Sequence, residues 1–257
     1  MSFCKGCISG VTHEGTAQGK VEEINGVAVY VGTPTVDYPK DKALLFLPDV
    51  FGLGLINNQL LVDDYAKNGY KTYLVDYLGG DPILKDALTG GGPPGFDFGE
   101  WIRRHGQEQT RPLLNKVVKG LKDQGVKTFV ATGYCFGARY LFDLVFDGEI
   151  KAAIVSHPTF IVAPDDLERY AKSSVPLLIN SCEFDERFPQ ESQASADKIL
   201  GGGTQENSTG DGPKYKRTYW PGCSHGFAVR GDLSKPEVKA GKEGAFKASV
   251  DWLSANF

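Results

Sequence analysis

Short runs rich in β-branched and aromatic residues alternate with amphipathic stretches along most of this 257-residue chain. Turn residues or charged residues bound each run, a pattern typical of strands. The predicted strands are Val27–Val31, Ala43–Leu47, Lys71–Val75, Val126–Ala131, Ala152–Val155, Val175–Asn180 and Tyr215–Trp220. The amphipathic stretches predict helices at Asn57–Asn68, Pro112–Gln124 and Glu243–Phe257. Because helices that connect parallel strands lie against the sheet, the sequence predicts an α/β fold, with a mostly parallel central sheet and helices on both faces.

Size and charge narrow the possible classes of protein. With 41% hydrophobic and 23% charged residues, we expect a single domain over 1–257, with an N-terminal arm over 1–20. A net charge of −4 excludes the surplus of positive charge that nucleic acid and anionic membranes require, so neither is an expected partner. The start of the chain lacks a signal peptide, and the five cysteines do not form a secreted disulfide framework. We expect a cytoplasmic protein, with its oligomeric state left open.

Two segments contain no regular pattern, Gly79–Gly106 and Gly201–Pro213. A long loop inside a compact domain is often a lid over a binding site, so residues 79–106 are a candidate lid, with a passive surface loop as the equal alternative. Its candidate contact residues are Trp101, Arg103, Arg104 and His105. Packing and hydrogen bonds that anchor the loop are the alternative role for its tryptophan and histidine. Gly201–Pro213 is interpreted as a solvated turn.

The strongest chemical signal is Gly133–Gly137 (GYCFG), which follows a predicted strand and precedes a helix-compatible stretch at Ala138–Phe146. This is the pattern of a nucleophile elbow, a sharp turn that needs small residues two positions before and after the nucleophile. The turn would present the Cys135 sulfur at the carboxyl edge of the sheet, where the helix N-terminus favours a thiolate. Cys135 is the candidate nucleophile, and a buried structural cysteine is the alternative.

A cysteine nucleophile needs a base, and the base needs a carboxylate that orients it. His225 lies in a glycine-flanked loop after one predicted strand, and Asp185 follows another. The chain order of nucleophile, acid and histidine is that of an α/β-hydrolase, which predicts a Cys135, Asp185, His225 triad. Glu183 and Glu186 compete for the acid role, and a solvated acidic turn is the alternative for all three carboxylates.

The same fold holds the reaction's oxyanion with the amide after the nucleophile and an amide from the loop after an early strand. Here these are the amides of Phe136 and Val50. Asp49 would lie at the same sheet edge as Cys135, with Phe51 as a further candidate pocket residue. We hypothesise that the Asp49 carboxylate accepts a hydrogen bond from the neutral thiol and disfavours the thiolate until substrate arrives.

The elbow, the acid turn, the histidine loop and Pro48–Gly52 together resemble the dienelactone hydrolase family over most of the chain. Gly133–Ala138 (GYCFGA), Ser156–Pro158 (SHP) and Ser224–Gly231 (SHGFAVRG) are similar to its fungal branch. The resemblance implies an α/β-hydrolase fold and a Cys-His-Asp triad that acts on lactones or activated esters without metal or organic cofactor. It also implies that an acidic residue pairs with the resting thiol, at Asp49, where the bacterial pattern has Glu.

Other residues are secondary candidates. In the bacterial pattern, arginines bind the substrate carboxylate, and Arg230 is the nearest counterpart, one residue further from His225 than in that pattern. Arg103 and Arg104 are alternative anion-binding residues, with solvated surface charge as the other reading. His157 is a candidate substrate contact or pocket-lining residue.

The remaining cysteines are assigned structural roles. Cys4 and Cys7, followed by His13, have the spacing of zinc ligands, but a structural site needs four ligands and no fourth lies nearby. No metal is therefore predicted. Cys182 and Cys223 flank the acid and histidine loops and are interpreted as small buried hydrophobic residues.

The sequence thus predicts a hydrolase that cleaves a small-molecule lactone or activated ester through a thioester on Cys135, without a cofactor. One alternative is a triad enzyme of a specialised metabolic pathway that performs carbon–carbon cleavage or cyclisation. Another is a non-catalytic relative that uses the pocket for binding or for redox sensing through Cys135. Identifying the products and testing their dependence on Cys135 would separate these alternatives.

Overall fold

The computed structural model of the protein describes residues 10–84, 96–207 and 212–257. Its strands are β1 (Lys20–Ile24), β2 (Val27–Gly32), β3 (Lys42–Leu47), β4 (Thr72–Val75), β5 (Thr128–Tyr134), β6 (Ile150–Ser156), β7 (Leu177–Phe184), β8 (Glu206–Asn207) and β9 (Tyr215–Ser224). Its helices are α1 (Ile56–Lys67), α2 (Phe98–Arg104), α3 (Gln107–Asp123), α4 (Gly137–Phe146), α5 (Asp165–Tyr170), α6 (Gln190–Leu200), α7 (Phe227–Arg230) and α8 (Pro236–Asn256). Each predicted strand and helix is present, most with shifted ends.

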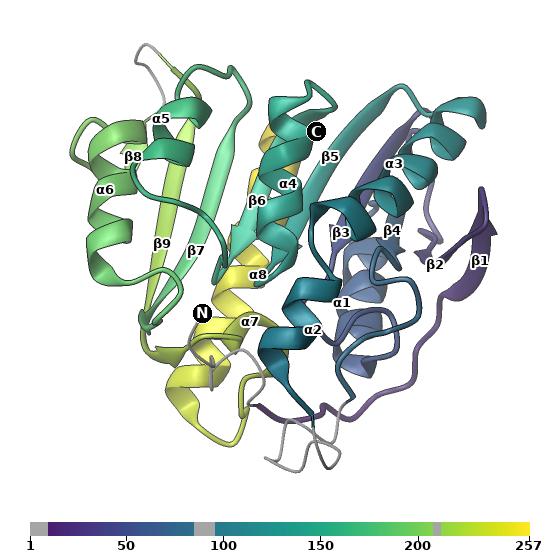
Figure 1. The fold of residues 1–257 in the computed structure, drawn as a ribbon, viewed down its shortest axis with the longest axis horizontal. Coiled ribbons are helices and arrows are strands. Elements are labelled where there is room, and N and C mark those ends of the chain that lie inside the picture. Colours follow the sequence, from purple (N-terminus) through teal and green to yellow (C-terminus); the bar gives the residue numbers. More distant parts are fainter. Residues whose placement is uncertain (1–9, 85–95, 208–211) are drawn as a thin grey trace.

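The strands form one twisted sheet in the order β1-β2-β4-β3-β5-β6-β7-β9-β8 (Figure 1). The strands from β4 to β9 in this order are parallel, and the antiparallel pairings lie at the two edges, where β1, β2 and β8 join. Strand β3 lies between β4 and β5, so the chain reverses its direction of growth across the sheet at β3. In open α/β sheets such a switch point, at the carboxyl ends of the strands, is where ligands bind.

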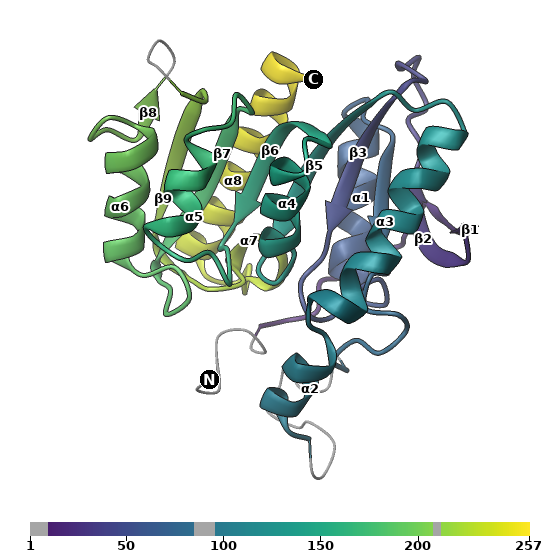
Figure 2. The same ribbon diagram turned by 45° about the horizontal axis from the view of Figure 1, so that its top comes forward.

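Helices cover both faces of the sheet, as predicted. Figures 1 and 2 show α3, α4, α5 and α6 on one face and α1 and α8 on the other. The central strands are buried from both sides: Ala43–Leu47 of β3 are all 0% exposed. Such strands are continuous apolar runs, which explains why they were recognisable in the sequence.

Helices α3 and α8 begin more than one turn before their predicted starts. Helix α3 starts at Gln107, so Pro112 lies inside the helix and not at its first position. Helix α8 starts at Lys235–Pro236, with proline in the first turn. Glycines in the first half of α8 weaken the helical pattern in the sequence. They also let the helix approach β9 closely, since a Cβ on Gly244 would lie 2.0 Å from the Trp220 ring. The close approach, and not helix propensity, accounts for glycine here.

The segment predicted as irregular over 79–106 is partly helical, which corrects that prediction for Phe98–Arg104. The Asp97 side chain caps α2 by accepting a hydrogen bond from the Glu100 N–H, 2.9 Å away. Residues 85–95, the centre of the candidate lid, lie outside the described residues. Similarly, the predicted turn at 201–213 contains the short strand β8, which pairs with β9.

The described part of the N-terminal arm, from residue 10 to β1, lies against α1 and the α7 region. The Val11 N–H donates to the Arg230 carbonyl at 2.9 Å, and the Asn57 side chain donates to the Val11 carbonyl at 2.9 Å. The His13 ring lies 2.8 Å from the Gly231 carbonyl. This segment therefore ties the early part of the chain to the histidine loop, 218 residues away.

Candidate active site

Cys135 occupies the turn between β5 and α4, with a φ of +49°, in the left-handed region. Two glycines make this turn possible because their neighbours leave no room for a side chain. A Cβ on Gly133 would lie 3.0 Å from the Gly137 carbonyl oxygen, and one on Gly137 would lie 2.1 Å from the Leu47 carbonyl oxygen. The Cys135 N–H donates to Ser156 of β6 at 3.1 Å. The geometry is that of a nucleophile elbow.

His225 and Asp185 meet beside this turn. Asp185 follows β7, His225 follows β9, and the His225 Nδ1 lies 2.9 Å from Asp185 Oδ1. The same carboxylate oxygen accepts the backbone N–H groups of Arg187 and Phe188, at 2.8 and 3.1 Å. The competing acids do not make this contact: Glu183 accepts the Gly222 N–H instead. Asp185 is thus the carboxylate in contact with His225.

Burial and the contact between His225 and Asp185 shift the pKa of each group in opposite directions. Burial acts to raise the pKa of Asp185, but the charge and hydrogen bond of His225, with the two backbone donors, lower it. Burial acts to lower the pKa of His225, but the charges of Asp185 and Cys135 and hydrogen bonds to both raise it above its ordinary value. The two side chains are 2% and 1% exposed, so solvent screens this pair little. The contact with Asp185 therefore stabilises the imidazolium that forms when His225 takes up a proton.

Thr159 is a site residue that the sequence analysis missed. Its hydroxyl oxygen lies 3.4 Å from the Cys135 sulfur and 3.5 Å from His225 Nε2. Its backbone N–H donates to the Cys135 carbonyl at 3.0 Å. The only sequence signal was its position two residues after His157, within the segment whose SHP motif resembled the family.

Asp49 and Arg230, which the sequence analysis assigned separately, form a buried ion pair. Arg230 Nε lies 2.8 Å from Asp49 Oδ2, and both side chains are 0% exposed. The other carboxylate oxygen of Asp49 accepts the Asn58 amide at 3.1 Å and the Phe51 N–H at 3.2 Å. The Arg230 guanidinium also lies over the Phe51 ring, 5.0 Å from its centroid. The positive charge of Arg230 is therefore balanced inside the protein, mainly by the Asp49 carboxylate.

Asp49 is electrostatically linked to the nucleophile. Burial raises the pKa of Asp49, the charge of Arg230 lowers it, and the charge of Cys135 raises it again. A negative sulfur and a negative Asp49 therefore disfavour each other. This repulsion has the sign that the thiol-modulating hypothesis requires.

The two predicted oxyanion donors come from the elbow itself and from the loop after β3. Val50 follows β3 and Phe136 precedes α4, and both are buried, at 1% and 2% exposed. Within residues 10–84, 96–207 and 212–257, neither backbone N–H donates a hydrogen bond to a protein acceptor. Buried N–H groups without protein partners are typical of a site that binds a developing negative charge.

His157 is fully buried against the triad. Its ring lies edge-on to His225, with centroids 5.0 Å apart, and neither ring nitrogen has a hydrogen-bond partner among the described residues. Burial lowers the pKa of His157 well below its ordinary value, and the charges of His225 and Arg230 lower it further. His157 is therefore neutral, and its ring packs against the histidine whose pKa is raised.

Trp101 of α2 is the residue of the candidate lid that reaches the elbow. It is 1% exposed, and its ring packs against Phe136, with centroids 5.7 Å apart. Its indole N–H donates to the Asp81 carbonyl at 2.9 Å, and it stacks on His105. These contacts match the anchoring role considered for Trp101 and His105.

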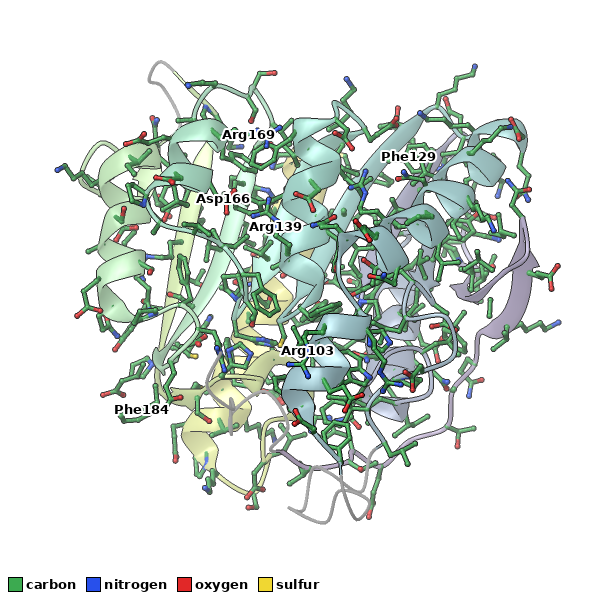
Figure 3. The ribbon with its side chains drawn as sticks, viewed as in Figure 1. Arg103, Phe129, Arg139, Asp166, Arg169 and Phe184 are labelled. Atoms are coloured by element: carbon green, nitrogen blue, oxygen red, sulfur yellow. The ribbon has the colours of Figure 1, made fainter. Side chains whose placement is uncertain are left out.

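The lid arginines are placed differently. Arg103 lies on α2, well apart in Figure 3 from Phe184 at the end of β7. Arg104 lies 3.5 Å from Asp81 in an exposed ion pair. The structure therefore brings Trp101 to the elbow, while Arg104 pairs at the surface.

The secondary cysteines are packed. Burial raises the pKa of Cys182, and the charge of Asp185, 3.8 Å from its sulfur, raises it further. Burial also raises the pKa of Cys223, to about 11. Both thiols stay protonated near neutral pH, as expected of small buried residues. Cys4 and Cys7 lie outside the described residues. Among the side chains that the structure describes, no group of three His, Cys, Asp or Glu residues is arranged to hold a metal ion.

Comparison with known proteins identifies the family of the chain. The family model for the dienelactone hydrolase family matches residues 27–257. The chain belongs to the dienelactone hydrolase family. The resemblance found in the motifs is thus confirmed, and with it membership in a class of ester and lactone hydrolases.

Fungal proteins of this family resemble the chain over nearly its whole length. Hydrolase pyvD of Aspergillus violaceofuscus is 34% identical over 253 residues, which cover 96% of this chain and 94% of that protein. Dienlactone hydrolase 1 of Gibberella moniliformis is 31% identical, over 96% of this chain and 91% of that protein.

Solved structures confirm the α/β-hydrolase fold. A putative dienelactone hydrolase from Klebsiella pneumoniae superposes with a TM-score of 0.65 at 14% identity, over 89% of this chain and 92% of that one. A dienelactone hydrolase-like promiscuous phosphotriesterase from metagenomic libraries gives a TM-score of 0.63 at 16% identity, over 93% of this chain and 98% of that one. In the described residues no helix has the length and apolar character to cross a bilayer.

Proposed function

We propose that this dienelactone hydrolase family member cleaves a small lactone or activated ester through Cys135, with His225 as base and Asp185 as its orienting acid. The observation that carries the proposal is the convergence of three loops on one sheet edge. The loop after β5 carries Cys135 in a left-handed conformation, the loop after β7 carries the buried Asp185, and the loop after β9 carries His225 in contact with Asp185. This is the spatial requirement for activating a weak nucleophile.

The proposed cycle has two halves. In the first, His225 Nε2 takes the Cys135 proton and the thiolate attacks the carbonyl carbon. The N–H groups of Val50 and Phe136 then donate to the oxyanion, and His225 returns the proton to the leaving alkoxide. The acyl group remains on sulfur as a thioester; for a lactone, the freed alcohol stays attached to it. In the second half His225 deprotonates a water, which cleaves the thioester and restores the thiol.

Asp185 and Asp49 have opposite roles in this proposal. Asp185 stabilises the imidazolium that forms when the proton moves to His225. Asp49 disfavours the thiolate, because its charge and that of the sulfur repel each other. The Asp49–Arg230 pair keeps this carboxylate fixed beside the elbow, so a cysteine without substrate stays mostly protonated. We further propose that the reaction needs no cofactor and that the protein acts in the cytoplasm.

The first test measures hydrolysis by wild type and Cys135→Ala side by side. The panel contains p-nitrophenyl acetate and several five-membered unsaturated lactones, with products identified by mass spectrometry. We expect activity on at least one ester or lactone in wild type and a loss of at least roughly a thousandfold in the variant. Acid-quenched wild-type enzyme should carry an acyl adduct on the Cys135 peptide.

The same panel separates the alternatives. Activity that survives in Cys135→Ala would contradict the assigned nucleophile. Products of carbon–carbon cleavage or cyclisation would keep the triad but change the reaction. A wild-type protein inactive on the whole panel would favour the non-catalytic binding or redox-sensing role over hydrolysis of small esters.

A further inference from the structure

The Thr159 hydroxyl lies between the two groups that exchange a proton in the proposed function, on which this inference rests. It is 3.4 Å from the Cys135 sulfur and 3.5 Å from His225 Nε2, and Thr159 is 3% exposed. Both contacts are within reach of one hydroxyl, which carries a single O–H donor and two acceptor lone pairs. Its donor can serve the sulfur or the imidazole, but not both at once.

The backbone holds this hydroxyl in place. Thr159 donates its N–H to the Cys135 carbonyl at 3.0 Å, and Cys135 donates its N–H to the Ser156 carbonyl at 3.1 Å. The residues around it have left-handed conformations, with φ of +39° at His157 and +61° at Phe160. Such conformations are unfavourable for residues with side chains and persist where the surrounding structure enforces them. The loop after β6 is therefore fastened to the elbow in a defined geometry.

We propose that Thr159 is a positioning residue that stabilises the Cys135 thiolate by donating its hydroxyl hydrogen to the sulfur. While the thiol is protonated, His225 Nε2 is an acceptor, and the Thr159 O–H has two possible acceptors. When the proton moves from sulfur to Nε2, that nitrogen becomes a donor and can no longer accept. The O–H is then directed to the sulfur, which has gained a negative charge. Thr159 thus favours the thiolate and imidazolium over the neutral pair.

This role offsets the repulsion from Asp49. The titratable groups coupled to Cys135 include His225 after β9, Asp49 after β3 and Tyr77 after β4. His225 favours the thiolate, while Asp49 disfavours it when charged. A neutral donor in the same buried space adds stabilisation without a further charge to desolvate. Replacing Thr159 leaves these three groups in place, so their contributions cancel in a comparison of variants.

The test compares Thr159→Val, which removes the hydroxyl and keeps the shape, with Thr159→Ser, which keeps the hydroxyl. The rate of alkylation of Cys135 by iodoacetamide is measured from pH 4 to 10. The modified Cys135 peptide is quantified by mass spectrometry, because Cys4 and Cys7 are further thiols in the chain. We expect the valine variant to shift the midpoint of this profile upward by about one pH unit, a tenfold change in the ionisation constant. The serine variant should stay near the wild-type midpoint.

The outcomes separate this inference from the proposed function. A valine variant with the wild-type midpoint, while Cys135→Ala is inactive on the ester panel, would overturn the role of Thr159 and leave the nucleophile intact. Ester hydrolysis that persists in Cys135→Ala would instead overturn the proposed function. Thermal melts of both Thr159 variants control for folding. If the valine variant does not fold, a serine variant with a clearly shifted midpoint is the result that overturns the inference.

Discussion

At the scale of single residues, the site contains two buried histidines whose pKa values are shifted in opposite directions. His225 has Asp185 at 2.9 Å, and this partner raises its pKa despite burial. His157 has no hydrogen-bond partner for its ring among the described residues, and burial keeps its pKa well below the ordinary value. Two buried rings only 5.0 Å apart disfavour being charged at the same time, because their positive charges repel each other. The pairing with Asp185 decides which histidine takes the proton.

The His225–Asp185 pair makes stability depend on pH. The raised pKa of His225 gives a contribution that is full below its ordinary value of 6.5 and is lost as pH rises through the folded pKa. The lowered pKa of Asp185 gives a contribution that is full above 3.8 and is lost as pH falls through the folded pKa. We expect the difference in unfolding free energy between wild type and His225→Gln to be larger at pH 5 than at pH 9. Urea unfolding at both values measures it, and an equal difference would contradict the assigned pKa directions.

At the scale of elements, the elbow and the β3–α1 loop are in contact without any side chain between them. Gly137 at the start of α4 faces the Leu47 carbonyl, and α4 packs against β5 and β6, beside α5 on the same face of the sheet (Figure 2). The same two elements supply the Phe136 and Val50 amides. Their separation is thus set by a backbone-to-backbone contact, which is more rigid than one made through side chains.

Gly137→Ala should therefore disrupt both stability and activity. Its Cβ would lie 2.1 Å from the Leu47 carbonyl oxygen, so either α4 or the β3–α1 loop must move. We expect a loss of at least about 3 kcal/mol in unfolding free energy and a fall in kcat that exceeds any rise in KM. Gly54→Ala is the matched control, because a Cβ there meets nothing within 4 Å. Equal stability of the two variants would show that the close approach does not constrain the elbow.

The sequence predicted those strands and turns that are determined by residues close together in the chain. Strands β3, β5 and β6 are apolar runs buried on both faces, and the elbow glycines stand in a fixed pattern around Cys135. Strand β1 (KVEEI) was missed because four of its five residues are exposed, so no apolar pattern marks it. The contacts of Thr159 and the pairing of Asp49 with Arg230 were missed for another reason. They depend on how distant segments pack, which residue spacing does not record.

At the scale of the whole molecule, the Asp49–Arg230 pair joins the first loop of the parallel sheet to the last quarter of the chain. The two residues are 181 positions apart, and both side chains are completely buried. A buried pair is costly to assemble, but losing one partner costs more, because a charge then remains without compensation. The pair therefore acts as a long-range constraint on the site.

Arg230→Met alone should reduce the unfolding free energy by about 3–5 kcal/mol, because Asp49 would remain buried without its cation. The double variant Asp49→Asn with Arg230→Met should lose less than the sum of the two single changes. Urea unfolding of all four proteins measures this coupling. The exposed pair Lys247–Asp251, with side chains 75% and 62% exposed, is the control, and Lys247→Met should cost under about 1 kcal/mol. Additive losses at Asp49 and Arg230 would contradict the coupling.

The same pair has a consequence during protein synthesis. Residue 49 leaves the ribosome 181 residues before residue 230, so until then the Asp49 carboxylate lacks its buried cation and must remain hydrated. His225 also emerges late, within the same stretch of chain. Since N-terminal segments begin to fold first, the sheet can collapse early, but Cys135 meets His225, and Asp49 meets Arg230, only after residue 230 has emerged. If the proposed triad is correct, we expect a ribosome-bound chain that has not yet exposed residue 230 to show no hydrolysis of p-nitrophenyl acetate.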